Sequence, residues 1–250
     1  MRAMILAAGL GTRLRPLTDS RPKALVEVGG RTLLEITLSR LRAFGVHDVI
    51  INVHHFAEMV VDYLRANNNF GMHISVSREV ELLDTGGGLK KASHFFLGDF
   101  STFEEPFILH NVDVISTIDL RRMAESHTQN RALATLAAQQ RETSRYLLFD
   151  ETLQLCGRRS GGDQKSEMVR PAAAAEALAF CGIHVISPRI FSMMPEESSF
   201  SIIPWYLRLA GNGEKIFAFR ADEYYWRDVG RPEHVAQAAR DLEQKILQAD

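Results

Sequence analysis

The sequence has few cysteines, no long apolar run and almost no net charge. Only two of its 250 residues are cysteines, Cys156 and Cys181, and both lie in apolar stretches. We expect buried free thiols of a reducing compartment rather than a disulfide framework. No apolar run approaches the ~20 residues of a membrane span. A formal charge of −2 gives no bulk attraction to nucleic acid or to a membrane surface. We therefore expect a cytoplasmic protein that binds neither nucleic acid nor membrane.

Two common phosphate-binding loops are also missing, although the chain opens with a glycine-rich segment. Residues 4–18 read MILAAGLGTRLRPLT, and Pro22 and Lys23 follow shortly after. The dinucleotide fingerprint requires Gly or Ala at position 14, and the P-loop requires Gly-Lys after four spacer residues. This chain has Leu14 and Arg15 at those positions. The opening segment is therefore a third kind of glycine loop.

Glycines and cations are combined in this opening segment in a way that suits phosphate binding. Gly9 and Gly11 allow the main chain to approach a ligand closely, and successive backbone N–H groups form an anion nest. Arg13 offers a planar fork to phosphate oxygens, whereas Lys23 offers a point charge. The residues expected to contact phosphate are Ala8, Gly9, Gly11, Thr12, Arg13 and Lys23.

Apolar patterning in the first half alternates short buried runs with helical periods. Strands are predicted at 2–7, 48–53, 73–76 and 107–110, and helices at 32–44, 56–66 and 88–96. This alternation predicts an α/β fold with a Rossmann-like, doubly wound and mainly parallel mixed sheet that carries helices on both faces. Ligands of such sheets bind beyond the carboxyl ends of the strands, where the opening glycine loop also lies.

The second half is richer in strands. Strands are predicted at 131–138, 146–149, 153–157 and 178–186, with few helices between them, so we expect an antiparallel extension of the sheet. Residues 158–176 have the weakest pattern, and both a mobile loop over the site and a disordered insert are open. An amphipathic helix is predicted at 232–248, with Pro232 in its first turn.

The opening motif resembles the signature of a known enzyme family. The run LAAGxGTRLxPLT followed by PK, at residues 6–23, is similar to that of the sugar-1-phosphate nucleotidyltransferases, or NDP-sugar pyrophosphorylases. The resemblance implies a single domain of the nucleotide-diphospho-sugar transferase fold. Its nucleotide-binding half would be 1–115, and its sugar-binding half with the closing helix would be 116–250. It also implies that Arg13 and Lys23 are catalytic and bind the nucleotide.

Two aspartates follow predicted strands. Asp113 comes after the fourth strand, and Asp228 stands in the run YWRDVG just before the last helix. Carboxylates at strand ends can converge, and Mg²⁺ is usually held by one or two carboxylates together with phosphates and water. The resemblance implies that both aspartates bind magnesium and that Asp113 is catalytic. The chain departs from the family pattern at Val112, where glycine is usual, and at Arg231, where threonine is usual.

A second glycine run, LDTGGGL at 83–89, resembles the family segment that lies against the nucleobase. The resemblance implies nucleotide contacts from Glu81, Thr85, Gly87 and Asn111. A triple glycine after an acidic residue and threonine favours the uridylyltransferases of N-acetylmuramate 1-phosphate. Guanylyltransferases of mannose 1-phosphate, or of another hexose or heptose, are the alternative, so the donor is UTP or GTP.

Sugar contacts are expected from the second half. The resemblance implies that Tyr146 and Gly182 bind the sugar. The family's Glu-Lys-Pro motif, whose lysine binds the sugar phosphate, is missing from this chain. Arg158, Arg159 and Lys165 are the available cations, and the sequence does not choose among them. Lys165 is included in the expected sugar site.

Two classes of function are left open. A magnesium-dependent nucleotidyltransferase acting on a nucleoside triphosphate and a sugar 1-phosphate is favoured by the cations and aspartates named above. A non-catalytic sugar-nucleotide sensor or regulatory subunit on the same fold is favoured only by Val112 and the missing lysine motif. Homodimers are common in the family that the chain resembles, so a homodimer is one expected assembly.

Overall fold

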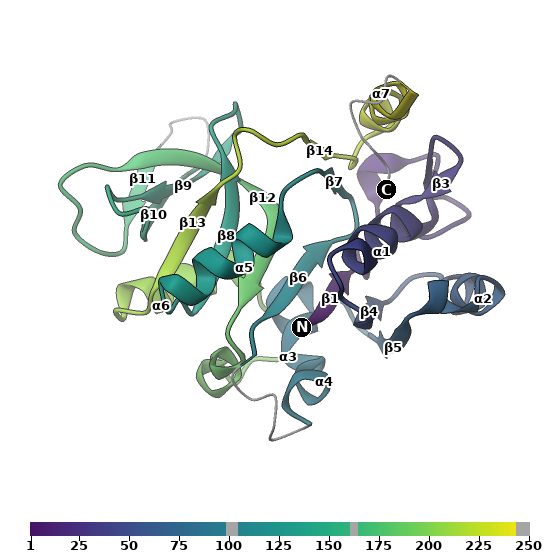
Figure 1. Ribbon diagram of the computed structural model, residues 1–250, viewed down its shortest axis with the longest axis horizontal. Helices are drawn as coiled ribbons and strands as arrows, with labels where there is room; N and C mark the ends of the chain where they lie inside the picture. Colours follow the sequence, from purple (N-terminus) through teal and green to yellow (C-terminus); the bar gives the residue numbers. More distant parts are fainter. Residues whose placement is uncertain (99–104, 161–164, 244–250) are drawn as a thin grey trace.

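The chain is built on a mixed sheet with helices on both of its faces. The computed structural model describes residues 1–98, 105–160 and 165–243. Within these residues ten strands form the main sheet, in the order β11-β10-β9-β12-β6-β1-β4-β5, with β8 beside β12 and β13 beside β8 (Figure 1). The predicted α/β class is confirmed.

Strands and helices of the first half alternate as predicted. In chain order they are β1 (Arg2–Leu6), the 3₁₀ turns η1 (Thr12–Leu14) and η2 (Lys23–Leu25), β2 (Glu27–Val28), β3 (Arg31–Thr32), α1 (Leu33–Ala43), β4 (Asp48–Val53), α2 (Ala57–Ala66), η3 (Asn68–Gly71), β5 (His73–Arg78), α3 (Asp84–Lys91), α4 (Ser93–Leu97), β6 (Phe107–Asn111) and β7 (Val114–Ser116). The predicted helix 88–96 is split, because α3 begins at Asp84 and α4 follows a break at Ala92.

Four parallel strands form the centre of this half. β1 pairs in parallel with β4 and β6, and β4 pairs in parallel with β5. β1, β4 and β6 are nearly continuous apolar runs because both faces of a parallel sheet are covered, whereas β5, at the end of the sheet, alternates polar and apolar residues. Ala3 and Ile5 belong to one hydrophobic cluster and Met4 to the other, so each face of β1 packs into a core. Because these strands run the same way, their carboxyl ends, such as Leu6 and Asn111, meet at one edge.

Antiparallel strands dominate the second half. Its elements are α5 (Leu120–Gln129), β8 (Ala134–Gln139), β9 (Arg145–Phe149), β10 (Leu155–Ser160), β11 (Lys165–Met168), β12 (Glu176–Ile186), η5 (Pro188–Met193), α6 (Ile202–Gly211), β13 (Ile216–Arg220), β14 (Trp226–Asp228) and α7 (Pro232–Glu243). β12 runs antiparallel to β6, β8 and β9, which confirms the predicted extension. Cys156 on β10 and Cys181 on β12 are buried free thiols, as expected.

Two helices, α5 and α6, have no counterpart among the predicted elements. Local signals for α5 do exist, since the Asp119 side chain caps it by accepting from the amides of Arg121 and Arg122. Its buried residues Leu120 and Met123 are spaced as on one helical face. In Figure 1, α5 crosses in front of the sheet. None of the described helices has the length and apolarity that crossing a membrane requires.

Residues 158–160 and 165–168 form strands, so the prediction of a loop or a disordered insert is wrong for them, whereas residues 169–175 contain no helix or strand. β10 continues to Ser160 and pairs antiparallel with β11, which places Arg158 opposite Glu167. Every residue of β11 is exposed, so the strand lacks the alternation by which a half-buried strand is recognised. Residues 161–164 lie outside the described residues, as do residues 244–248 of the predicted closing helix.

Three buried histidines make the stability of this fold depend on pH. Burial lowers the pKa of His110 and of His127 to about 4, and that of His184 to about 3. In the unfolded chain each imidazole has a pKa near 6.5. Below that pH the unfolded chain binds more protons than the folded one, so protonation favours unfolding.

We expect the free energy of unfolding to be highest above about pH 6.5 and to fall as the pH drops towards about 4. The variant His184→Gln removes one titrating group and retains a partner for the Tyr206 hydroxyl, which lies 3.1 Å from His184 Nδ1. Thermal unfolding at about pH 7.5 and about pH 5 should therefore show a smaller difference in Tm for the variant than for the wild type. An unchanged difference would contradict this assignment.

Candidate active site

A cavity of about 800 Å³ opens at the carboxyl ends of the central strands. It is lined by Arg13 from the opening loop, Asn111 at the end of β6, Tyr146 on β9, Gly182 on β12 and Asp228 at the end of β14. All five are residues that the sequence predicts for the site. The position agrees with the rule that ligands of open α/β sheets bind outside the carboxyl ends of the strands.

Pairing of β7 with β14 brings the two predicted metal ligands together. Asp113 lies in the turn before β7, and Asp228 ends the antiparallel strand β14. The amide of Val229 donates to the carbonyl of Asp113 at 2.8 Å. The Arg13 guanidinium lies at the same place, since its Nη2 is 3.0 Å from where a Cβ on Gly230 would be. Arg13 and Asp228 thus line the cavity beside the turn that holds Asp113, whereas Asp113 and Lys23 are not among the lining residues.

An ion pair joins Lys23 and Asp113, two of the three predicted catalytic residues. Lys23 Nζ donates to Asp113 Oδ2, and the two side chains are only 14% and 13% exposed. A pair shielded from water to this degree is stronger than a surface pair, because the effective dielectric constant is lower. Lys23 is therefore held beside the carboxylates, although it stands in η2, far from them in the sequence.

The donor chemistry of these two aspartates suits a hard cation. The Gly230 amide donates to Asp228 Oδ1 at 2.6 Å and so orients that carboxylate. Among the described residues, no three His, Cys, Asp or Glu side chains gather as a metal site. The protein would thus contribute the oxygens of Asp113 and Asp228, and phosphates and water would supply the other ligands. Such mixed coordination is usual for Mg²⁺.

The opening loop presents open backbone beside a cation. Of its predicted phosphate ligands, Gly9, Thr12 and Arg13 are exposed and Ala8 is buried. A Cβ on Gly9 would meet no atom within 4 Å, so a ligand can approach the main chain there. Gly11 has a different role, because its φ of 65° is left-handed and a Cβ would lie 2.9 Å from the Thr18 side chain. Gly11 is needed for the turn itself.

The second glycine run packs against the protein itself. A Cβ on Gly86 would lie 2.2 Å from the Phe200 ring, and one on Gly87 would lie 2.2 Å from the Ser198 carbonyl oxygen. The Phe200 carbonyl also accepts from the amides of Gly86 and Gly87. The hydroxyl of Thr85, a predicted nucleotide contact, accepts from the Ile202 amide at 3.0 Å, at the start of α6. These residues therefore anchor the run on the segment that precedes α6.

A buried carboxylate lies beside this run, but it is not the one that the sequence points to. Glu81 is exposed, whereas Glu79 is 5% exposed and its Oε1 is 2.8 Å from where a Cβ on Gly88 would lie. Both glutamates precede the run by a few residues, so the sequence pattern alone does not separate them.

Arginines dominate the remaining wall of the cavity. Arg158 is neutralised by Glu167, with Nε 2.6 Å from Oε2. Lys165, at the start of β11, is exposed and is not among the residues that line the cavity. Besides Arg13, the lining arginines are Arg141, Arg145, Arg158, Arg159, Arg227 and Arg231.

Arg141 is a cavity residue that the sequence does not indicate. Its guanidinium lies 3.8 Å from the centre of the Trp226 ring, and its Nη2 donates to the Phe180 carbonyl at 2.8 Å. Trp226 in turn donates from Nε1 to the Cys181 carbonyl at 2.7 Å. A single arginine in a polar stretch carries no pattern that would have revealed this stacking.

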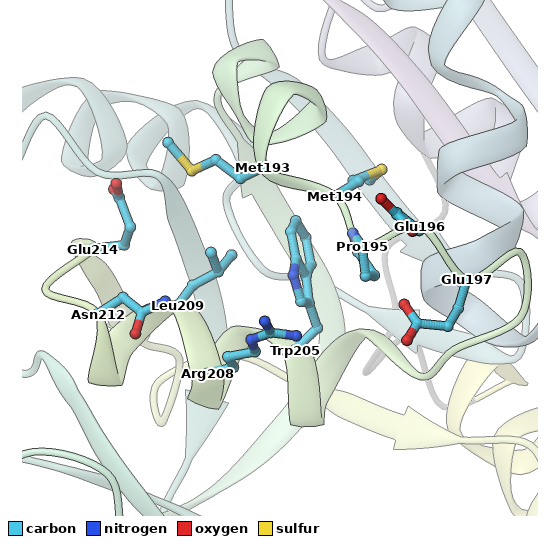
Figure 2. Close-up of a pocket in the computed structure, with 10 residues that line it drawn as sticks. All are labelled: Met193, Met194, Pro195, Glu196, Glu197, Trp205, Arg208, Leu209, Asn212 and Glu214. Atoms are coloured by element: carbon cyan, nitrogen blue, oxygen red, sulfur yellow. The ribbon is translucent and has the colours of Figure 1, made fainter.

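A second cavity, of about 540 Å³, lies away from the predicted site residues. Figure 2 shows Trp205 at its centre, with Glu196 and Glu197 on one side and Asn212 and Glu214 on the other. Lys90 on α3 holds one wall of this cavity. Its ammonium donates to the carbonyls of residues 195–197 at 2.6, 2.9 and 3.2 Å. This cavity borders the segment that anchors the glycine run.

The model of a protein family described as nucleotidyl transferase matches residues 2–245. The chain belongs to the nucleotidyl transferase family. The resemblance seen in the sequence and the prediction of an enzyme are confirmed, since the relatives of this nucleotidyl transferase are named as transferases.

Two relatives are similar to this nucleotidyl transferase in sequence, and one solved structure is similar to it in fold. It is 38% identical over 240 residues to N-acetylmuramate alpha-1-phosphate uridylyltransferase of Caulobacter vibrioides, with 92% of each chain covered. It is 31% identical over 235 residues to mannose-1-phosphate guanyltransferase of Yarrowia lipolytica, with 93% of this chain covered but only 61% of the relative. HddC from Yersinia pseudotuberculosis complexed with GMP-PN superposes with a TM-score of 0.74 at 22% identity, covering 96% and 99% of the chains. The expected transferase fold is confirmed.

The anchoring of the glycine run generates a stability prediction. Thr85→Val keeps the shape of the side chain but removes the acceptor of the Ile202 amide, so the free energy of unfolding should fall by about 1–2 kcal/mol. Thr85→Ser keeps the hydroxyl and is the matched control. Chemical denaturation measures both variants, and equal stability of the Val and Ser variants would show that the hydrogen bond contributes nothing.

Proposed function

We propose that this nucleotidyl transferase joins a nucleoside triphosphate to a sugar 1-phosphate and releases pyrophosphate. The observation that carries the proposal is the position of Arg13 and Asp228 in the cavity wall, next to the turn that holds the Lys23–Asp113 ion pair. Two cations and two carboxylates held together beside an open glycine backbone suit a reaction between two phosphate groups. The transferase names of its relatives support the same reaction class.

In this reaction an oxygen of the sugar phosphate attacks the α-phosphorus in line, and the bond to the bridging oxygen of the leaving pyrophosphate breaks. The attacking phosphate is already ionised, so no protein base is needed. Arg13 holds the leaving pyrophosphate, and Lys23 stabilises charge on the α-phosphate. Catalysis then consists of positioning and electrostatic stabilisation.

Asp113 and Asp228 hold magnesium in the proposed mechanism. A bound ion would supply positive charge that offsets the charge of the phosphates. Lys23 neutralises the Asp113 oxygen that it contacts, while the Gly230 amide fixes the orientation of the Asp228 carboxylate. Both aspartates are thus oriented by the chain itself.

Removing the charge of Arg13 or of Asp228 should abolish most of the transferase activity. We expect Arg13→Gln and Asp228→Asn each to lower kcat/KM at least about a hundredfold, because each removes a group that acts on charge in the transition state. Asp62→Asn, at an exposed residue of α2 that among the described residues pairs only with Arg65, is the matched control. Pyrophosphate release measures all three, and near-wild-type turnover of either site variant would contradict the mechanism.

For the substrates we propose N-acetylmuramate 1-phosphate and UTP. The relative that supports this pair matches over 92% of both chains, whereas the mannose-1-phosphate relative extends well beyond the match. The arginine-rich wall adds a chemical argument. N-acetylmuramate carries a lactyl carboxylate, so it brings a second anionic group that mannose 1-phosphate lacks, and arginine binds carboxylates well.

Arg159 is the cation that we propose for this acidic acceptor. It lies opposite Tyr146 in the β9–β10 pair, and both residues line the cavity. Residues directly opposite each other on paired strands share one face of the sheet. Its neighbour Arg158 is neutralised by Glu167, and Lys165 does not line the cavity. Among the described residues no carboxylate pairs with Arg159.

A comparison of two sugars tests this assignment. N-acetylglucosamine 1-phosphate differs from N-acetylmuramate 1-phosphate only by the missing lactyl ether, so the wild type should prefer the latter with UTP. Arg159→Gln should reduce that preference about tenfold, the factor expected for one charge-assisted contact. Lys165→Gln is the control and should leave it unchanged. Equal use of the two sugars, or faster turnover of mannose 1-phosphate with GTP, would refute the substrate assignment.

A further inference from the structure

Three hydrogen bonds connect the ends of β1, β4 and β5 beneath the nucleotide loops. The amide of Ala7, the first residue after β1, donates to Asn52 Oδ1 at 2.7 Å. Asn52 Nδ2 donates to Glu79 Oε1 at 2.7 Å. The amide of Leu83 donates to Glu79 Oε2 at 3.2 Å. The side chains of Asn52 and Glu79, which we call the amide–carboxylate pair, therefore link two separate loops.

The amide–carboxylate pair is buried and depends on these bonds. Asn52 is 3% exposed and Glu79 is 5% exposed. Among the described residues no cation forms an ion pair with Glu79, so hydrogen bonds alone compensate for the loss of water around its carboxylate. A buried polar group that loses its partner costs much more than one exposed to solvent. The pair therefore has one strongly favoured arrangement.

Gly88 explains why the glycine run has a third member. A Cβ at this position would lie 2.8 Å from both Asn52 Nδ2 and Glu79 Oε1. A Cβ there would force one of these two groups to move, so glycine lets the backbone of α3 lie directly on the bond between the two side chains. The pair thus contacts three backbone segments: the start of the opening loop at Ala7, the start of the glycine run at Leu83, and α3.

The two loops that the pair connects have different tasks in the proposed function. Ala7 begins the opening loop, which is proposed to hold phosphates, and Leu83 begins the run proposed to contact the nucleobase. A nucleoside triphosphate spans both loops, so its affinity depends on their separation and mutual orientation. Groups that fix this geometry before binding reduce the cost of ordering on association.

We propose that Asn52 and Glu79 are positioning residues that hold the phosphate loop and the base loop at the separation required by the nucleoside triphosphate. This inference rests on the proposed function for the identity of the ligand. The pair does not contact the reacting atoms. It acts through the Ala7 and Leu83 amides and through the backbone of α3 at Gly88.

Single substitutions break the pattern of donors and acceptors. Glu79→Gln supplies one acceptor oxygen and one NH₂ group, so it can accept from Asn52 or from the Leu83 amide, but not from both. Asn52→Asp keeps the acceptor for Ala7 but places a second carboxylate against Glu79, and like charges at this distance repel. We expect each variant to raise the dissociation constant of UTP about tenfold, with KM for UTP rising in parallel.

The double variant Asn52→Asp with Glu79→Gln reverses the central hydrogen bond. The new aspartate accepts from Ala7 and from the new glutamine amide, and the glutamine oxygen accepts from Leu83. All three bonds and the total charge of the pair are restored. We expect UTP affinity to return to within about twofold of the wild type, because the geometry of both loops is recovered.

A buried hydrogen bond elsewhere provides the control for general destabilisation. His127 Nδ1 and Thr135 Oγ1 are 3.1 Å apart between α5 and β8. Thr135→Val removes this bond without touching either nucleotide loop. Its Tm should fall, but its dissociation constant for UTP and its KM for both substrates should stay at wild-type values.

Isothermal titration with UTP or GTP and magnesium, together with thermal unfolding and steady-state kinetics, decides the proposal. Rescue of affinity in the double variant supports it, with KM for the sugar phosphate unchanged throughout. Wild-type affinity in both single variants would overturn it, as would a double variant that regains Tm but not affinity. If either single variant fails to fold, Gly88→Ala is measured in its place, because the added methyl group would contact both partners of the Asn52–Glu79 hydrogen bond. Unchanged UTP affinity of Gly88→Ala would overturn the proposal. Tight binding by the wild type without pyrophosphate release would refute the proposed function and leave the positioning role intact.

Discussion

The antiparallel pairing of β7 with β14 is the contact on which the arrangement of the site depends. It joins a strand in the middle of the chain to one near its end, and the hydrogen bond from the Val229 amide to the Asp113 carbonyl ties the backbone at Asp113 to the residue that follows Asp228. Arg13 in η1 lies beside Gly230 and Asp228, and Lys23 in η2 pairs with Asp113. Each charged group comes from a different element, so no single segment of the chain contains the site.

Close backbone packing is the second constraint, and it explains most of the glycines of the two loops, each by a different contact. Gly11 is needed for a left-handed turn, while Gly9 faces open space. Gly86 and Gly87 lie against the segment before α6, and Gly88 lies on buried polar side chains. A run that would serve as a flexible turn in isolation is therefore tightly packed here. Its order comes from the protein interior rather than from a ligand.

The sequence predicts local features of this molecule well and non-local ones poorly. Gly9, Gly11 and Arg13 form a motif at fixed spacing, so the opening glycine loop is recognisable from the order of its residues alone. Strands such as β1 and β4 are predictable because burial on both faces requires continuous apolar runs. The exposed strand β11 has no such pattern and is missed. The stacking of Arg141 on Trp226 and the burial of Glu79 depend on contacts across the sheet, which spacing along the chain does not encode.

The same pairing of β7 with β14 also relates the site to how the chain folds. Contacts between segments far apart in sequence form slowly, because a long loop must close before they are gained. The parallel strands β1, β4 and β5 come from the first third of the chain, whereas Asp228 follows Asp113 by more than a hundred residues. A ligand that needs both carboxylates therefore binds only the fully folded chain and not its partly folded forms. By mass action it stabilises that fold against every partly folded form.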